Sequence, residues 1–65
     1  MRSEWTGRDC RAERARAGLT QAELAALLGV SPRRVASVEA QYRVTTEWEE
    51  RIRAALHLPK EVTNA

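Results

Sequence analysis

The hydrophobic residues in the middle of the chain follow two short helical patterns that are separated by a glycine. Residues 20–39, TQAELAALLGVSPRRVASVE, place leucines and then valines three or four positions apart, with Gly29 between the two runs. This spacing gathers apolar side chains on one face of a helix. The pattern therefore predicts two short helices whose apolar faces meet. The expected internal cluster consists of Leu24, Leu28, Val30, Val35 and Val38.

Both helices begin at residues that favour helix starts. Thr20 and Glu23 match the Thr-x-x-Glu capping box, so Thr20 is the predicted N-cap of the first helix. Gly29 suits the end of that helix, because glycine adopts a positive φ without a Cβ clash. Ser31 is the predicted N-cap of the second helix. Pro32 follows it at the first helical position, where the N–H that proline lacks would have no partner anyway.

A short turn containing glycine, placed between two helices, is typical of a helix-turn-helix motif. The second helix opens with Pro-Arg-Arg at 32–34 and carries no acid before Glu39. An ordinary helical hairpin would explain the apolar pattern equally well, but not this basic start. We therefore interpret residues 20–39 as a helix-turn-helix core whose second helix enters the major groove of DNA, as this motif does.

A further helix is expected before this core. Thr6 and Asp9 match a capping box for a helix from about Thr6 to Ala17, ended by Gly18. Its apolar side is thin, so we expect Trp5 to help anchor it. The apolar residues on that side are Cys10, Ala12, Ala15 and Ala17.

The last helix is expected from about Glu47 to His57, with Thr46 and Glu49 as its capping pair and Pro59 as its stop. Hydrophobic residues recur along it at helical spacing and form a single stripe. This stripe consists of Trp48, Ile52, Ala55 and Leu56.

Together these elements predict an all-α fold, one compact domain of four helices, or of five with a short terminal turn. It spans residues 1–65, with a loose arm at 1–5 and a tail at 59–65. Such a length is near the lower limit for an unaided core. A lone cysteine, Cys10, excludes an internal disulfide, and with the lone His57 it cannot form a four-ligand zinc site. We expect no metal, no cofactor and a buried, unreactive Cys10.

The charge balance is mildly basic, with 11 Lys and Arg against 9 Asp and Glu. Nearly all the basic residues are arginine, whose guanidinium binds phosphate and guanine in a bidentate manner. There is no run of ~18 apolar residues and no apolar signal-peptide core, which predicts a cytoplasmic protein without a membrane partner. No catalytic set, carboxylate pair or glycine-rich phosphate loop is recognisable, so neither enzyme activity nor a small-molecule ligand is expected.

The motif resembles the DNA-binding domain of the lambdoid phage repressors and Cro proteins, the XRE type of helix-turn-helix regulators. The resemblance rests on TQAELAALLGVS followed by VxxVE and extends from about Arg14 to Leu58. It implies a lambda-repressor-like fold and an ion pair between Arg14 and Glu39, for which two solvated charges are the alternative. Many relatives carry glycine where this chain has Gln41. The second helix therefore either turns without glycine or continues to about Tyr42.

The same resemblance implies which side chains face DNA. Bases would be contacted by Pro32, Arg33 and Ser37. Only Arg33 can form a bidentate pair with guanine, worth about 1–3 kcal/mol of discrimination. The DNA backbone would be held by Thr20, Gln21, Ser31, Arg34, Tyr42, Arg43 and Thr45. The alternative for the arginines is an ordinary solvated surface, and for Arg2, Arg8 and Arg11 it stays open whether they do more than solvate the first helix.

These expectations lead to a transcriptional regulator, bacterial or phage-encoded, that acts as a repressor. It would bind a double-stranded DNA operator as a homodimer, on inverted half-sites about 34–36 Å apart. Dimer contacts are expected at Trp48, Leu58 and Val62, although plain core packing is the favoured alternative for Trp48. The alternative function is a protein-binding helical module, such as an antitoxin or inhibitor, whose main target is another protein.

Overall fold

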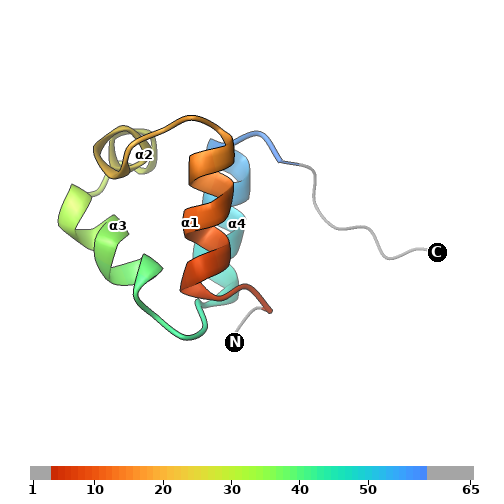
Figure 1. Cartoon of the computed structure of the whole chain (residues 1–65). Helices are drawn as coiled ribbons and strands as arrows, with labels where there is room; N and C mark the ends of the chain where they lie inside the picture. Colours follow the sequence, from red (N-terminus) through yellow and green to blue (C-terminus); the bar gives the residue numbers. More distant parts are fainter. Residues whose placement is uncertain (1–3, 59–65) are drawn as a thin grey trace.

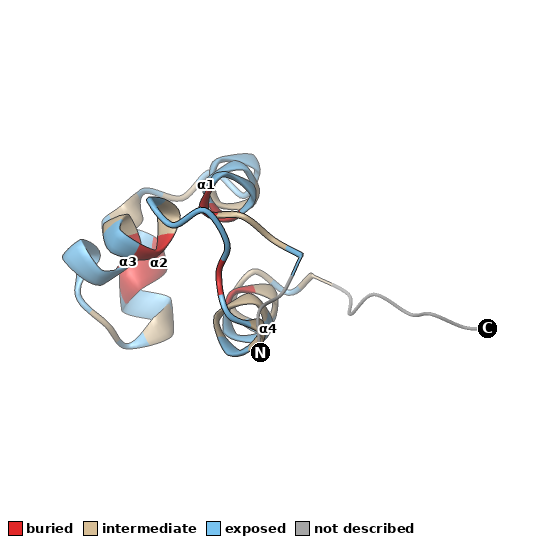
Figure 2. Ribbon diagram, turned by 90° about the horizontal axis from the view of Figure 1, so that it is seen from below, coloured by how far each residue is buried: buried red, intermediate tan, exposed pale blue. Residues whose placement is uncertain are grey.

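Residues 4–58, the part of the chain that the computed structural model describes, form four helices (Figure 1). They are α1 Gly7–Arg16, α2 Gln21–Leu28, α3 Pro32–Glu39 and α4 Thr46–Ala55. Figure 2 shows α1 and α4 on opposite sides of the core, with α2 and α3 together along a third side. The predicted all-α fold with four helices is confirmed within this range. None of these helices is long and apolar enough to span a bilayer.

Three of the helices begin where the sequence predicts. Thr6 caps α1 and Thr20 caps α2, and each hydroxyl accepts from the backbone N–H of the acid three residues later, at 3.1 and 3.0 Å. Those acids, Asp9 and Glu23, accept in turn from the N–H of the threonine and complete both capping boxes. Ser31 caps α3 through its hydroxyl. The sequence therefore fixes these starts by local hydrogen bonding alone.

The last helix begins one residue earlier than predicted. Thr45 rather than Thr46 is its N-cap, and the Thr45 hydroxyl accepts from the N–H of Trp48 at 3.2 Å. The cause lies one residue before the cap. Val44 is fully buried and its N–H donates to the Trp5 carbonyl at 3.0 Å, which fixes the course of the chain into the helix.

The end of α4 also differs from the prediction. The helix stops at Ala55, and His57 takes a left-handed conformation with φ of 59°. The N–H of Leu58 then donates back to the Arg53 carbonyl at 2.8 Å. This is the Schellman arrangement of a helix end. The same arrangement ends α2, where Gly29 takes the left-handed conformation. Because a histidine occupies the position that glycine usually fills, the sequence pattern does not reveal this end. Glu49, expected to complete a capping box with Thr46, instead accepts from the Arg53 guanidinium at 2.7 Å.

The core consists of two adjoining clusters rather than the single one expected. The first contains Cys10, Val38, Val44 and Ile52, and the second Leu24, Ala25 and Val35. α3 thus contributes one valine to each cluster, and the half-buried Leu28 and Leu56 pack against both. Val44 comes from the loop before α4, where no periodicity marks it as a core residue.

α1 packs through its N-terminal end rather than along a side of alanines. Contrary to the prediction, Ala12, Ala15 and Ala17 are exposed. The buried residues of α1 are Gly7 and Cys10. The Gly7 N–H donates to the Gln41 carbonyl at 2.9 Å, and a Cβ at Gly7 would overlap the carbonyl oxygens of Glu39 and Gln41. Only glycine therefore allows α1 to approach the end of α3 so closely.

The segments that flank α1 and α3 settle two further expectations. Trp5 packs against the first cluster, so it serves as the expected anchor and the chain is not a loose arm at this residue. α3 ends at Glu39, and the chain turns at Gln41 without glycine and without a positive φ. The rest of the predicted arm, residues 1–3, and the predicted tail, residues 59–65, lie outside the described residues.

Candidate nucleic-acid interface

α3 turns its valines inward and its basic start outward. Val35 and Val38 are buried. The exposed residues of the helix are Pro32, Arg33, Arg34 and Ser37. Ser31, Arg33, Arg34 and Ser37 together line a shallow hollow on this side of the helix. The three predicted base contacts therefore all lie on the exposed surface of α3.

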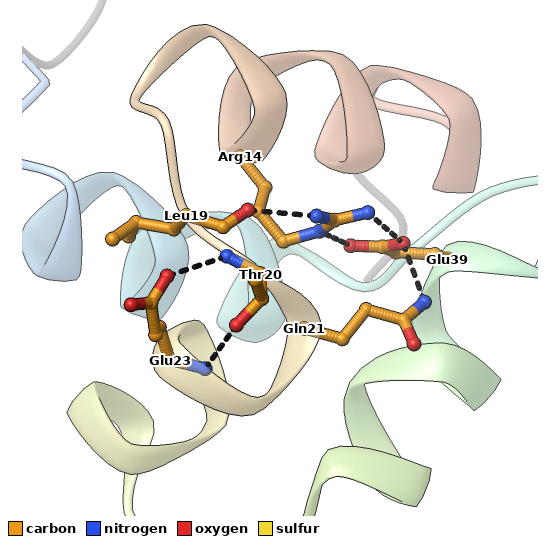
Figure 3. A network of polar contacts seen from close by, with 6 residues as sticks. All are labelled: Arg14, Leu19, Thr20, Gln21, Glu23 and Glu39. Carbon is orange, nitrogen blue, oxygen red and sulfur yellow. Dashed lines mark hydrogen bonds and ion pairs between the residues drawn. The ribbon is translucent and has the colours of Figure 1, made fainter.

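Glu39, the one acid of α3, lies in a network of polar contacts with α1 and the start of α2 (Figure 3). Arg14 donates from Nε to Oε2 at 2.7 Å and from Nη2 to Oε1 at 3.2 Å. Gln21 adds a bond from Nε2 to Oε1 at 3.1 Å. The side chains of Arg14 and Glu39 are only 13% and 5% exposed. Hydrogen bonding to Glu39 raises the pKa of Arg14 above its usual value, against the opposing effect of burial.

This network affects the surface of α3 in two ways. It neutralises Glu39, so the acid does not repel phosphate. It also fixes α3 against α1 through the bonds from Arg14 to Glu39. A third bond, from Arg14 Nη1 to the Leu19 carbonyl at 2.8 Å, holds the guanidinium in position. The Gln21 amide has two N–H groups. It makes no further hydrogen bond within residues 4–58, which leaves one N–H for a phosphate.

The predicted backbone contacts lie before and after α3. Thr20 and Gln21 stand at the start of α2, and Ser31 and Arg34 stand at the start of α3. The others, Tyr42, Arg43 and Thr45, follow α3 in the loop. Tyr42 is 79% exposed, with the Arg43 guanidinium 5.7 Å from its ring centroid. The hydroxyls of Thr20 and Thr45 accept capping hydrogen bonds, but each keeps its own O–H as a donor. Capping and phosphate binding are therefore compatible at these residues.

A family model described as helix-turn-helix matches residues 11–47, more than half of the chain. The chain belongs to the helix-turn-helix family of the Cro and phage-repressor (XRE) type. The match begins within α1, covers α2 and α3 in full and ends just inside α4. No curated protein and no solved structure matches the chain significantly. Since this family consists of DNA-binding regulatory domains, the chain carries a DNA-binding helix-turn-helix.

In this XRE-type domain, Trp48 of α4 contacts Arg34, which is predicted to bind a DNA phosphate. The guanidinium of Arg34 lies 5.8 Å from the ring centroid of Trp48, and that of Arg51 lies 4.8 Å from it. Arg51 is also held by a bond from Nη2 to the Leu28 carbonyl at 2.9 Å. Cation–π contacts of this kind are worth about 0.5–1 kcal/mol at exposed sites. Trp48 thus ties Arg34 to α4, a contact that sequence spacing does not suggest.

The surface around α4 also carries the predicted dimer contacts. Trp48 packs against the first cluster and Leu58 is half-buried, whereas Val62 lies outside the described residues. The sequence pattern misses Leu27, which is 59% exposed. It lines a hollow between α2 and α4 together with Leu28, Arg51, Ala54 and Ala55.

The remaining candidate for chemistry is the cysteine. Cys10 is fully buried, as predicted for a small core residue. Burial, reinforced by the charge of Glu39, raises the pKa of its thiol to about 12, so the thiol is protonated at neutral pH. Across residues 4–58, no three His, Cys, Asp or Glu side chains are grouped so that they could hold a metal ion.

Proposed function

We propose that this XRE-type domain is a sequence-specific transcriptional regulator, and that it represses by occupying an inverted-repeat DNA operator as a homodimer. The observation that carries the proposal is the surface of α3. Arg33, Arg34 and Ser37 are exposed there, while the one acid of the helix, Glu39, is neutralised by Arg14. A helix with this charge distribution suits the negative potential of a DNA groove.

Sequence discrimination is assigned to the exposed face of α3. Arg33 pairs with O6 and N7 of a guanine, the commonest specific contact in the major groove. Pro32 has no N–H to donate, so it contributes an apolar contact such as one with a thymine methyl group. Ser37 donates or accepts a single hydrogen bond and discriminates weakly. A half-site built on these contacts has one dominant guanine.

Backbone contacts are assigned to both flanks of α3. On one side, the N-terminus of α2 offers free N–H groups and a positive dipole end, with Thr20 and Gln21 beside it. On the other side, the loop offers Tyr42, Arg43 and Thr45. Ser31 and Arg34 complete the set at the start of α3. Because such contacts displace condensed counterions, affinity should fall with salt by about 0.9 log units per log unit of salt for each phosphate bound.

The homodimer is proposed because one module makes few contacts. The proposed dimer face is the C-terminal half of α4, with Leu58 after the helix and the exposed Leu27 across the hollow from it. Sedimentation of Leu27→Glu and Leu58→Glu tests this face, with Ala26→Glu as an exposed control on α2. Weaker association in the two leucine variants alone supports the face, and equal association in all three excludes it.

Selection of bound duplexes from a random DNA pool tests the function directly. The expected product is an inverted repeat whose half-site centres are about one helical turn apart. Enrichment of no sequence would refute the proposal. The variant Arg33→Ala/Arg34→Ala distinguishes it from a protein-binding module: a regulator loses DNA binding and cellular activity together, whereas a protein-binding module keeps its cellular activity.

A further inference from the structure

Most arginines of the described residues have partners within the domain. Arg14 and Arg16 pair with glutamates, and Arg34 and Arg43 lie over aromatic rings. Arg51 lies over a ring and donates to a backbone carbonyl, and Arg53 lies over a ring and pairs with a glutamate. Within residues 4–58, three arginines make no ion pair, hydrogen bond or ring contact. They are Arg8, Arg11 and Arg33. Since Arg33 is the proposed base contact, the positions of the other two become informative.

Both lie beside the C-terminal half of α3. Arg11 lines a hollow that it shares with Gln21, Ala36 and Ala40. Arg8, three residues earlier on α1, lines a second hollow that it shares with Ala40 and Tyr42. Ala40 borders both hollows, so the two guanidinium groups flank the end of α3 on the surface that also carries Gln21 and Tyr42.

The position of α1 against α3 is fixed by contacts on both sides of these arginines. Gly7 donates to the Gln41 carbonyl before them, and Arg14 pairs with Glu39 after them. Two acids close to these arginines, Glu39 in both hollows and Asp9 beside Arg8 in the sequence, are already engaged. Glu39 is neutralised by Arg14, and the Asp9 carboxylate accepts from the backbone N–H of Thr6 at 2.9 Å. The two arginines thus stand on a fixed helix, with no charged, hydrogen-bonded or ring partner among residues 4–58.

We propose that Arg8 and Arg11 form a second phosphate-binding element on α1 that grips the duplex backbone alongside the helix-turn-helix. The ligand is the phosphodiester backbone, so the element adds affinity without sequence preference. This inference rests on the proposed function, because it requires α3 to face DNA. It extends the DNA-binding surface to Arg8, which precedes the residues matched by the family model.

The test compares Arg8→Ala, Arg11→Ala and the double variant with Arg16→Ala. Arg16 is on the same helix and loses the same charge, but its partner is Glu13. Binding is titrated at several salt concentrations with the selected duplex and with a random-sequence duplex. The double variant should weaken binding to both duplexes by the same factor and lower the salt slope by about 1.8, twice the contribution of one phosphate. Far-UV circular dichroism should be unchanged, since neither side chain makes an ion pair, hydrogen bond or ring contact in the described part of the chain.

The outcomes separate this inference from the function on which it rests. If Arg8→Ala and Arg11→Ala behave as Arg16→Ala does, while Arg33→Ala reduces the preference for the selected duplex, the second element is refuted and the regulator stands. If Arg8→Ala or Arg11→Ala alters the preference between duplexes, the pair contacts bases and the proposal is also overturned. If the unmodified protein shows no preference for the selected duplex, the proposed function as a sequence-specific regulator is itself refuted.

Discussion

Replacement of Arg14 by methionine gives the sharpest test of how this fold is held together. The change keeps a long apolar stem but removes the guanidinium, and it leaves Glu39, only 5% exposed, with the Gln21 amide as its single partner. Removing one member of a buried pair costs about 3–5 kcal/mol, because the other charge is left uncompensated. Since Gln21 remains, we expect the lower end, about 3 kcal/mol.

That loss is large for a domain of this size. At roughly 0.05–0.15 kcal/mol per residue, the free energy of unfolding lies between about 3 and 10 kcal/mol. Urea titration followed by circular dichroism measures the change as a shift of the midpoint at constant slope. Arg16→Met is the matched control, because its pair with Glu13 is surface-exposed, at 72% and 24%, and such pairs are worth about 0–1 kcal/mol. Equal midpoints for the two variants would refute the structural role of the Arg14–Glu39 pair.

Three further changes test other parts of the fold. Gly7→Ala should destabilise the domain by about 1–3 kcal/mol in urea titration, because the new Cβ overlaps the carbonyl oxygens of Glu39 and Gln41, and an unchanged midpoint would contradict this close approach. His57→Gly should raise the thermal midpoint, since a left-handed non-glycine residue costs about 1–2 kcal/mol, more than glycine loses by its freedom in the unfolded chain. The Cys10 thiol, with its pKa raised to about 12, binds its proton more tightly in the folded state. Its contribution to stability is therefore complete below the unfolded pKa near 9.0 and is lost as pH rises from there towards 12, and a Cys10→Ala variant should lack this part of the alkaline decline in unfolding free energy.

The sequence predicts those features that depend on neighbouring residues. Thr6, Thr20 and Ser31 cap their helices because the acceptor and the N–H are three residues apart, and no tertiary contact is needed. Gly29 marks the turn for an equally local reason. Where prediction fails, a distant contact decides. The start of α4 follows from Val44 bonding to Trp5, and the packing of α1 follows from Gly7 meeting Gln41.

The same distinction applies to the candidate interface. The exposure of Arg33 could be predicted, since the valines of α3 leave that face outward. The contact of Arg34 with Trp48 could not, because it joins two helices with no shared pattern. The significance of Arg8 and Arg11 was equally hidden. Their sequence neighbours do not show that, among the described arginines, only these two and Arg33 make no ion pair, hydrogen bond or ring contact.

The proposed phosphate-binding element makes α1 part of the DNA-binding surface and more than a support for the core. α3 is held at its start by its own cap, and α1 contacts its other end through Gly7 at Gln41 and Arg14 at Glu39. A helix fixed at one end by its cap and at the other by a neighbour cannot tilt unless that neighbour moves. The proposed orientation of Arg33 towards a base, and the positions of Arg8 and Arg11 beside the same helix, therefore depend on the same pair of contacts. The charged network around Glu39 would thus serve to fix the position of α3, although its desolvation is costly.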